Sequence, residues 1–348
     1  MFNNTQNDLS FRGLVTNMQY FLFMEFYSEV GTVLSFIGIV SNIINIRIFC
    51  AMGLADGITV SFLCLSIFDL AYLIISFALG ISIVLGVIEH RTPKAFFIKP
   101  QGVSIILTNF MVLVNIINVL TTTFLAVARC MCVAKPLQFK NWFSKTITLA
   151  FIGSFIVVSV VSYAPVIASL GFKTQFDIGK NITRPILWVS PKRDSIKVIT
   201  WIILNLILPF TTQFIIVVCI VIMANSLRVS SRFRQSAVSM SVADKKGNDI
   251  LSSKSTVPTD KLSGKDILVV QQVVLISVVY IICNTPKMII SVAAITVPGF
   301  TIGQRYSNLY LSVNTLRYQF EIFNSSVNTF IYYRYNTKFR ELLLTCFK

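Results

Sequence analysis

Long stretches of mostly apolar residues alternate with short polar segments along the chain. Seven such stretches lie near Val30–Ile48, Ile58–Ile88, Val103–Val127, Ile147–Phe172, Val198–Met223, Ile267–Val297 and Leu309–Tyr333. Roughly 20 helical residues cross a bilayer core about 30 Å thick, so each stretch is long enough to span a membrane. The pattern predicts an all-α membrane protein whose seven-helix bundle occupies residues 29–334.

The composition excludes two broad classes of protein. Charged residues make up 13% of the chain and hydrophobic residues 55%, and the mean hydropathy is +0.75. Soluble domains carry about 25% charged residues, so this chain has too little polar surface for a soluble enzyme. The net charge of +16 does not indicate a nucleic-acid partner, because the basic residues lie mainly between the apolar stretches, where they set membrane orientation.

The basic residues also predict the orientation of the bundle. They are more numerous in the segments that share a side with the C-terminus, and that side is therefore cytoplasmic. Two glycosylation sequons, at Asn3 and Asn181, then fall outside. We expect an extracellular N-terminus over residues 1–28 without a cleaved signal peptide, and a cytoplasmic tail over residues 335–348.

One cytoplasmic segment has a different composition from the rest. Residues 228–265 are rich in lysine, arginine, serine and threonine and poor in large apolar residues. Such a composition is typical of a disordered loop. The segment is either a solvated linker or a docking segment regulated by kinases, since phosphate would invert its local charge.

Polar residues inside the apolar stretches point to a functional interior. An ionisable residue at membrane depth is costly, and Asp69 lies in the middle of the second stretch. Amide and hydroxyl side chains occupy other stretches at Asn42, Asn115, Asn118, Asn324, Ser325 and Asn328. Such a group can either hold a monovalent cation such as sodium or form hydrogen bonds that hold the helices together.

The order and spacing of these residues resemble the rhodopsin-like (class A) G-protein-coupled receptors across the whole bundle. The matching segments are Gly38–Asn42, Leu65–Asp69, Ala128–Leu137, Cys283–Pro286 and Asn324–Tyr332, followed by Asn336–Arg340, which is similar to a short amphipathic helix that lies along the membrane. The resemblance assigns an activation network to Asn42, Asp69, Asn118, Asn324, Ser325, Asn328 and Tyr332. It also implies a plasma-membrane location.

The chain departs from this family at the cytoplasmic switch. Ala128 stands where the family has an acid before Arg129, and Asn284 stands where a tryptophan is usual before Pro286. By resemblance, Asp266 faces Arg129 and closes the cytoplasmic end, and Pro286 is the point about which the sixth helix moves. The alternative is that Asp266 merely caps its own helix.

The cysteines form a second departure. None of the seven falls in an outer segment, and Ser104 stands where the family has one partner of its outer disulfide. The resemblance therefore implies that this bridge is missing. Cys346 is either an acylation site or a free thiol.

The resemblance places Met111, Asn115, Lys287, Arg317 and Glu321 in an outer ligand cavity. Met111 stands where amine receptors have an acid, which disfavours an amine ligand. Two cations and one acid favour a small molecule or short peptide with an anionic group. Alternatively, Lys287 pairs with Glu321 across helices, and the long side chain of Arg317 extends outward.

We therefore expect a receptor that activates a heterotrimeric G protein, similar to invertebrate, molluscan-type chemosensory, orphan or peptide receptors. Receptor kinases and arrestin would act on residues 228–265, and membrane lipids would surround the bundle. The alternative is a transporter or ion-conducting protein that uses Asp69. An enzyme is not expected, because His90 is the single histidine and the sequence shows no catalytic pair, metal cluster or cofactor motif apart from the sodium candidate.

Overall fold

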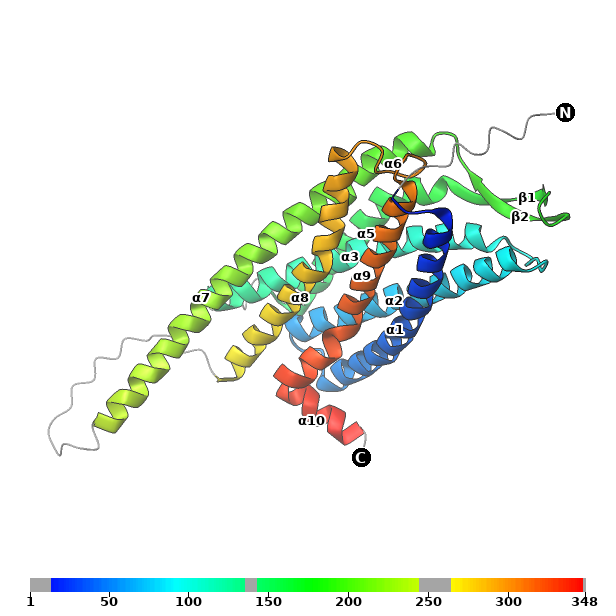
Figure 1. The fold of residues 1–348 in the computed structure, drawn as a ribbon. Coiled ribbons are helices and arrows are strands. Elements are labelled where there is room, and N and C mark those ends of the chain that lie inside the picture. Colours follow the sequence, from blue (N-terminus) through cyan, green and yellow to red (C-terminus); the bar gives the residue numbers. More distant parts are fainter. Residues whose placement is uncertain (1–13, 135–142, 244–263, 347–348) are drawn as a thin grey trace, which may run out of the picture.

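The computed structural model describes residues 14–134, 143–243 and 264–346. Long helices lie side by side, with a β-hairpin at one end and a short helix, α10, at the other (Figure 1). The elements are α1 (Asn17–Met52), α2 (Gly57–Arg91), α3 (Pro100–Ala134), α5 (Lys145–Ala168), β1 (Leu170–Asp177), β2 (Ile182–Val189), α6 (Arg193–Trp201), the π-helical segment η1 (Ile202–Ile207), α7 (Leu208–Ala243), α8 (Gly264–Thr296), α9 (Ser307–Tyr335) and α10 (Thr337–Cys346). We call these two ends the hairpin end and the α10 end.

Six stretches of helix in the described residues are long and apolar enough to cross a membrane, which indicates a multi-pass membrane protein. They are Asn17–Met52, Gly57–Arg91, Pro100–Ala134, Lys145–Ala168, Val198–Ser226 and Leu268–Thr296. The seventh predicted span lies in α9, which is 29 residues long. Its amides and its charged pair, Arg317 and Glu321, make it more polar than the other six.

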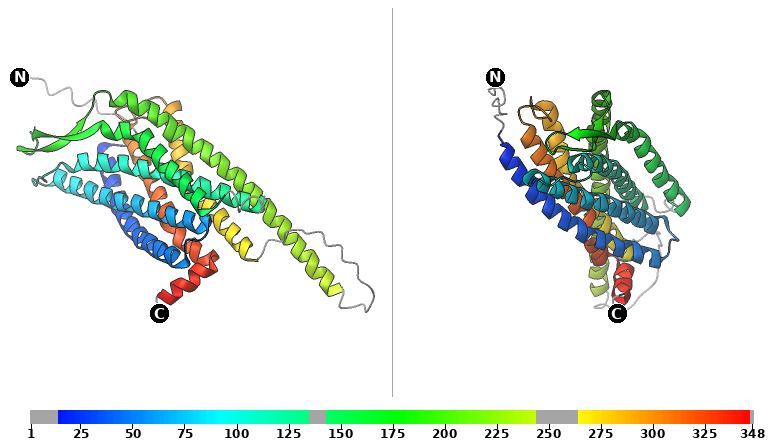
Figure 2. Two further views of the ribbon diagram at one scale, coloured as in Figure 1. Left: turned by 180° about the vertical axis from the view of Figure 1, so that it is seen from behind. Right: turned by 90° about the vertical axis from the view of Figure 1, so that its right-hand side faces the viewer.

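The helices pack as a bundle in which some neighbours follow one another along the chain and others do not. Helix α1 packs between α2 and α9, α3 contacts α2, α5 and α7, and α8 packs between α7 and α9. Figure 2 shows the same arrangement from behind and from the right-hand side of Figure 1. The chain ends of the bundle, α1 and α9, are therefore neighbours.

The α10 end is held together by aromatic side chains. Phe49, Phe62, Tyr332 and Phe339 are buried there, with ring centroids of neighbouring pairs 5.0 to 5.8 Å apart. Burying rings of this size excludes a large apolar area from solvent, and edge-to-face contacts add to the gain. Because Phe339 belongs to α10, this cluster fastens α10 to α1, α2 and α9.

The hairpin corrects one part of the sequence analysis. Strands β1 and β2 are antiparallel, with Leu170 opposite Val189 and Asp177 opposite Ile182. The predicted fourth span continued to Phe172, whereas α5 ends at Ala168 and the chain enters the first strand. No strand was predicted for the chain, so the all-α expectation is wrong for these residues.

The segment predicted to be a disordered loop, residues 228–265, is helical at both ends. Helix α7 continues to Ala243 and α8 begins at Gly264. The remaining residues, 244–263, lie outside the described part of the chain. The boundary was placed too early because the prediction followed the loss of apolar residues, whereas serine, lysine and arginine are compatible with a helix that has left the membrane.

A π-helical segment precedes the proline of the fifth span. Pro209 has no N–H, so it leaves the carbonyl of Asn205, four residues earlier, without its usual helical donor. The hydroxyl of Ser291 in α8 donates to this carbonyl over 3.1 Å. The irregular backbone is therefore satisfied by the neighbouring helix, as required where water is excluded.

The close approach of α1 to α9 and α2 depends on Gly38. A Cβ atom at this position would meet Leu73 Cδ1 at 2.9 Å, Ser326 Cβ at 3.0 Å and, still closer, Ser326 Oγ. We expect Gly38→Val to lower the free energy of unfolding by about 1–3 kcal/mol, because the added atoms force the helices apart. A reduced melting temperature of the purified protein in detergent would report this loss.

The matched control is Gly153→Val in α5, where a Cβ atom would meet nothing within 4 Å. This variant adds the same atoms at a helix position with free space around it. Its free energy of unfolding should lie within about 0.5 kcal/mol of the wild-type value. Equal melting of the two variants would contradict the importance of the α1–α9 contact.

Candidate functional site

Asp69 is the centre of a buried polar network in the middle of the bundle. Its side chain is 1% exposed, and its two carboxylate oxygens accept hydrogen bonds from Asn118 Nδ2 over 3.1 Å and from Asn328 Nδ2 over 2.9 Å. The three residues come from α2, α3 and α9. The carbonyl oxygen of the Asn118 side chain is buried and has no hydrogen-bond partner among the described residues, so two kinds of oxygen ligand for a hard cation lie in this region.

A second set of hydrogen bonds joins α1 to α9 beside this network. Asn42 Nδ2 donates to the carbonyl of Ser325 over 2.8 Å, and Thr329 Oγ1 donates to Asn45 Oδ1 over 2.8 Å. Thr329 is also hydrogen-bonded to Ser41. The hydroxyl of Thr329 therefore ties α9 to α1.

The structure brings most of the predicted network together. Asn42, Asp69, Asn118, Ser325 and Asn328 are all buried and hydrogen-bonded as described. Tyr332 lies closer to the α10 end, in the aromatic cluster described above. Asn324 is on the same helix, α9, and is half-buried.

Of the three predicted switch residues, the structure describes the side chains of Arg129 and Pro286 but not that of Asp266. Arg129 is buried near the end of α3, with its guanidinium 5.7 Å from the centre of the Phe62 ring. Pro286 lies inside α8. Asp266 is in the first turn of α8, but its side chain lies outside the described part, so the predicted contact with Arg129 stays a prediction.

A cavity of about 1410 Å³ opens at the hairpin end. Residues from α1, α2, α3, α5, the hairpin, α6, η1 and α9 line it. Of the five predicted ligand contacts, Met111 and Arg317 are on its wall, whereas Asn115, Lys287 and Glu321 are not. The cavity is larger than most small-molecule pockets and leaves room for a ligand of considerable size.

Below the cavity wall, the predicted charges form a compact buried cluster. Arg317 Nη1 lies 3.7 Å from Glu321 Oε1, one helical turn away, and the guanidinium stacks 4.3 Å from the centre of the Tyr318 ring. Glu321 also accepts hydrogen bonds from Tyr72 over 2.7 Å and from Asn115 over 3.4 Å. Arg317 does not extend outward, because its side chain is only 8% exposed.

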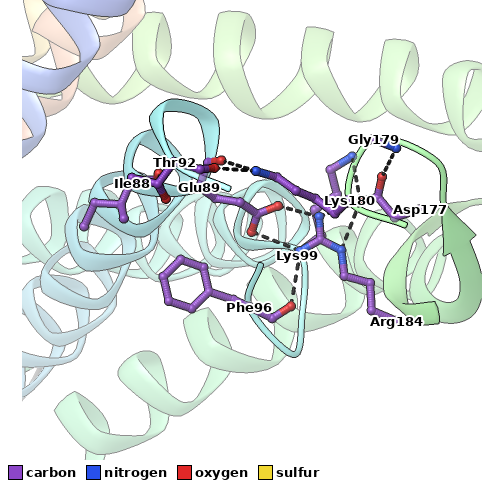
Figure 3. A network of polar contacts seen from close by, with 9 residues as sticks. All are labelled: Ile88, Glu89, Thr92, Phe96, Lys99, Asp177, Gly179, Lys180 and Arg184. Carbon is purple, nitrogen blue, oxygen red and sulfur yellow. Dashed lines mark hydrogen bonds and ion pairs between the residues drawn. The ribbon is translucent and has the colours of Figure 1, made fainter. Parts of the chain in front are cut away.

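The hairpin is fastened to α2 by a buried ion cluster that the sequence analysis missed (Figure 3). Arg184 of β2 is 2% exposed, and its guanidinium donates to both carboxylate oxygens of Glu89, at 3.0 Å for Oε2, and to Asp177 Oδ2 at 2.5 and 3.0 Å. Lys180 Nζ donates to the carbonyls of Glu89 and Thr92, each over 2.6 Å. The hairpin therefore closes one side of the cavity.

The same contacts control the ionisation of the hairpin. Hydrogen bonding from Arg184, which favours the charged carboxylate, lowers the pKa of Asp177 below its usual value, and the more distant Lys99 acts in the same direction. The two carboxylates in turn raise the pKa of Arg184. The ion cluster therefore stays charged in neutral solution.

Several other residues on the cavity wall were also missed. Asn109 accepts a hydrogen bond from the hydroxyl of Tyr163 over 3.0 Å. Trp201 and Asn205 reach the wall from α6 and η1, and Arg193 lies at the start of α6. A lone arginine between two apolar stretches gives no sequence signal that it faces a cavity, since it equally fits a solvated loop.

Of the predicted modification sites, only Asn181 has a side chain that the structure describes. Asn181 lies exposed at the tip of the hairpin, with a φ angle of 55° that asparagine tolerates well. Cys346 is the last residue of α10, and its side chain lies outside the described part, as does the whole of Asn3. Among the described residues no cluster of histidine, cysteine, aspartate or glutamate could hold a metal ion, and Cys50, Cys64, Cys130, Cys219 and Cys283 form no disulfide there.

Comparison with known proteins does not place the chain in a family. No family model matches the sequence, and no curated protein matches it significantly.

We predict that Asp69 and Asn328 are energetically coupled. In a double-mutant cycle with Asp69→Leu, Asn328→Leu and the double variant, each single change leaves a buried polar group without its partner, so the double variant should lose less stability than the sum. We expect a coupling energy of about 0.5–3 kcal/mol, measured from melting in detergent. A cycle between Asp69 and Asn109, which share no hydrogen bond, should show additive effects; additivity in both cycles would contradict the network.

We also predict that Arg184 holds the hairpin in place. Arg184→Gln leaves the buried carboxylates of Glu89 and Asp177 without the cation they share, and breaking a buried ion pair in this way costs up to about 3–5 kcal/mol. Amide hydrogen exchange across residues 170–189 should then accelerate by at least about tenfold, as measured by mass spectrometry.

Arg91→Gln is the control for this change. Arg91 pairs with Glu25 at 2.5 Å, but the two side chains are 54% and 26% exposed, so their pair contributes only about 0–1 kcal/mol. Its loss should leave exchange in the hairpin unchanged. If both variants behaved like the wild type, the ion cluster would not be what holds the hairpin.

Proposed function

We propose that the protein is a divergent rhodopsin-like G-protein-coupled receptor of the plasma membrane, with a chemosensory or neuropeptide-like role. It senses an extracellular small molecule or short peptide and activates a heterotrimeric G protein. The observation that carries the proposal is the hydrogen-bonded network of Asp69, Asn118 and Asn328. It links three helices between an open cavity at the hairpin end and the buried Arg129 toward the α10 end.

The proposal treats α9 as the seventh span. Its polar side chains at Arg317, Glu321, Ser325 and Asn328 are buried in the bundle, whereas apolar side chains such as Phe330 are exposed. Polar groups that face the interior of a bundle are compatible with a transmembrane helix. Seven spans place the hairpin end and the N-terminus outside and α10 inside, which leaves Asn181 available for glycosylation.

In this receptor a ligand acts only through a difference in affinity between two states of the bundle. A ligand in the cavity that contacts Arg317 acts directly on α9. The same helix contains Asn328, which is hydrogen-bonded to Asp69 of α2. Movement of the cytoplasmic half of α8 about Pro286 then separates Asp266 from Arg129 and admits the G protein. Asp69 and the free side-chain oxygen of Asn118 would be the ligands of a sodium ion, and residues 228–265 would serve receptor kinases and arrestin.

The test is ligand-independent nucleotide exchange on a panel of heterotrimeric G proteins, in membranes that contain the full chain at matched surface levels. We expect the wild type to exceed empty membranes. Arg129→Gln should raise this activity by up to about tenfold, because losing about 1.4 kcal/mol from the proposed contact with Asp266 destabilises the closed state. Asp266→Ala should raise it, because the closed state loses a contact.

Arg47→Gln is the matched control, since Arg47 is an exposed arginine of α1 that also lies toward the α10 end of the bundle. It removes the same charge and should behave like the wild type. If neither the wild type nor Asp266→Ala exceeded empty membranes with any G protein of the panel, the proposed coupling would be contradicted. Equal activity of all four proteins would retain the receptor and refute the switch.

A further inference from the structure

Two arginines from different helices line the cavity. Arg317 projects from α9 and Arg193 from the first turn of α6, and both line the cavity. Both interact electrostatically with the phenol of Tyr163, which lines the cavity from α5. Both guanidinium groups are therefore on the cavity wall within electrostatic range of Tyr163.

Both arginines have donors that no described residue uses. The Nε atoms of Arg193 and Arg317 are buried and have no hydrogen-bond partner in the described part of the chain. Arg317 is 7% exposed, so water cannot readily satisfy this donor. Leaving such a buried donor unpaired costs about 1–3 kcal/mol, which a ligand with acceptor oxygens would recover.

Among the described side chains, the cations around this region are not fully paired with acids. Glu321 is the carboxylate that pairs with Arg317, but the pair is long at 3.7 Å, and its oxygens also accept from Tyr72 and Asn115. Lys287, which is 4% exposed, interacts with the same carboxylate. The other acids on the wall, Glu89 and Asp177, are taken up by Arg184.

We infer that the cavity binds the anionic group of its ligand, a carboxylate, sulfate or phosphate, between Arg193 and Arg317. Guanidinium groups suit such groups because their planar N–H donors match the spacing of the acceptor oxygens. The remaining wall accommodates an apolar body through side chains such as Leu79, Ile83, Met111, Val112, Trp201 and Tyr318. This inference rests on the proposed function, since it names the class of ligand that the receptor senses.

The local electrostatic potential can be measured without knowing the ligand. Val112→Cys places a thiol on the cavity wall, which has no cysteine among the described residues. Cells that express the full chain are treated with a negatively charged methanethiosulfonate (the ethylsulfonate) or a positively charged one (the ethyltrimethylammonium). Labelling rates are divided by the rate of each reagent with a free thiol in solution, and the unsubstituted protein gives the background.

We expect the anionic reagent to react at least about tenfold faster than the cationic one in the Val112→Cys protein. Adding Arg193→Gln or Arg317→Gln should each lower this ratio of labelling rates by about tenfold. Removing one positive charge from the cavity wall makes the local potential less favourable for the anionic reagent and more favourable for the cationic one. Adding Arg305→Gln removes an exposed arginine that does not line the cavity. It should change the ratio by less than about twofold, because solvent screens the charge.

A ratio near one in Val112→Cys, or a ratio unaffected by both cavity arginines, would overturn the inference. If Arg317→Gln failed to reach the cell surface because Glu321 lost its partner, Arg193→Gln, whose arginine is only half-buried, would decide the outcome. The labelling requires no G protein. An anion-selective cavity in a protein without nucleotide exchange would therefore refute only the receptor, and a neutral cavity in an active receptor would refute only the anionic ligand.

Discussion

Charges inside the bundle are compensated by side chains from other elements, and the arrangement of the helices depends on these contacts. A charge removed from water costs several kcal/mol unless its partners replace the lost hydration. Asp69 of α2 is satisfied by α3 and α9, and Arg184 of the hairpin by α2 and by its own turn. The contacts of Asp69 with α9 and of Arg184 with α2 join elements that are distant in the sequence, so these charges help to specify which elements are neighbours.

The two ends of the bundle use different interactions, and this gives them different mechanical properties. At the α10 end, Phe49, Phe62, Tyr332 and Phe339 fill the space between helices with rings, which is close packing that resists small displacements. At the hairpin end, the space is a cavity of about 1410 Å³ bordered by ion pairs. A buried ion pair is directional but does not fill space, so this end can keep a fixed shape around an open volume.

The sequence predicted the helices well because burial in lipid requires long apolar stretches that are visible in any single chain. It also placed Asn118 and Asn328, which donate to Asp69, in the same predicted group as Asp69, since polar residues at membrane depth have few alternatives to one another. It did not predict the hairpin, because the contact that secures it joins Arg184 to Glu89, which lie far apart in sequence and in an otherwise polar region. Arg193 was missed for a related reason: only the fold shows that the first turn of α6 faces the cavity.

The position of Arg317 connects the two kinds of contact. Its guanidinium is on the wall of the cavity, yet its partner Glu321 is hydrogen-bonded to Tyr72 of α2 and to Asn115 of α3. An anion that competes with Glu321 for Arg317 would weaken the attraction of one carboxylate for one cation, while Tyr72 and Asn115 still hold that carboxylate. These two hydrogen bonds reduce the free-energy cost of separating Glu321 from Arg317, and a lower cost requires less differential affinity from a ligand that shifts the population of conformations.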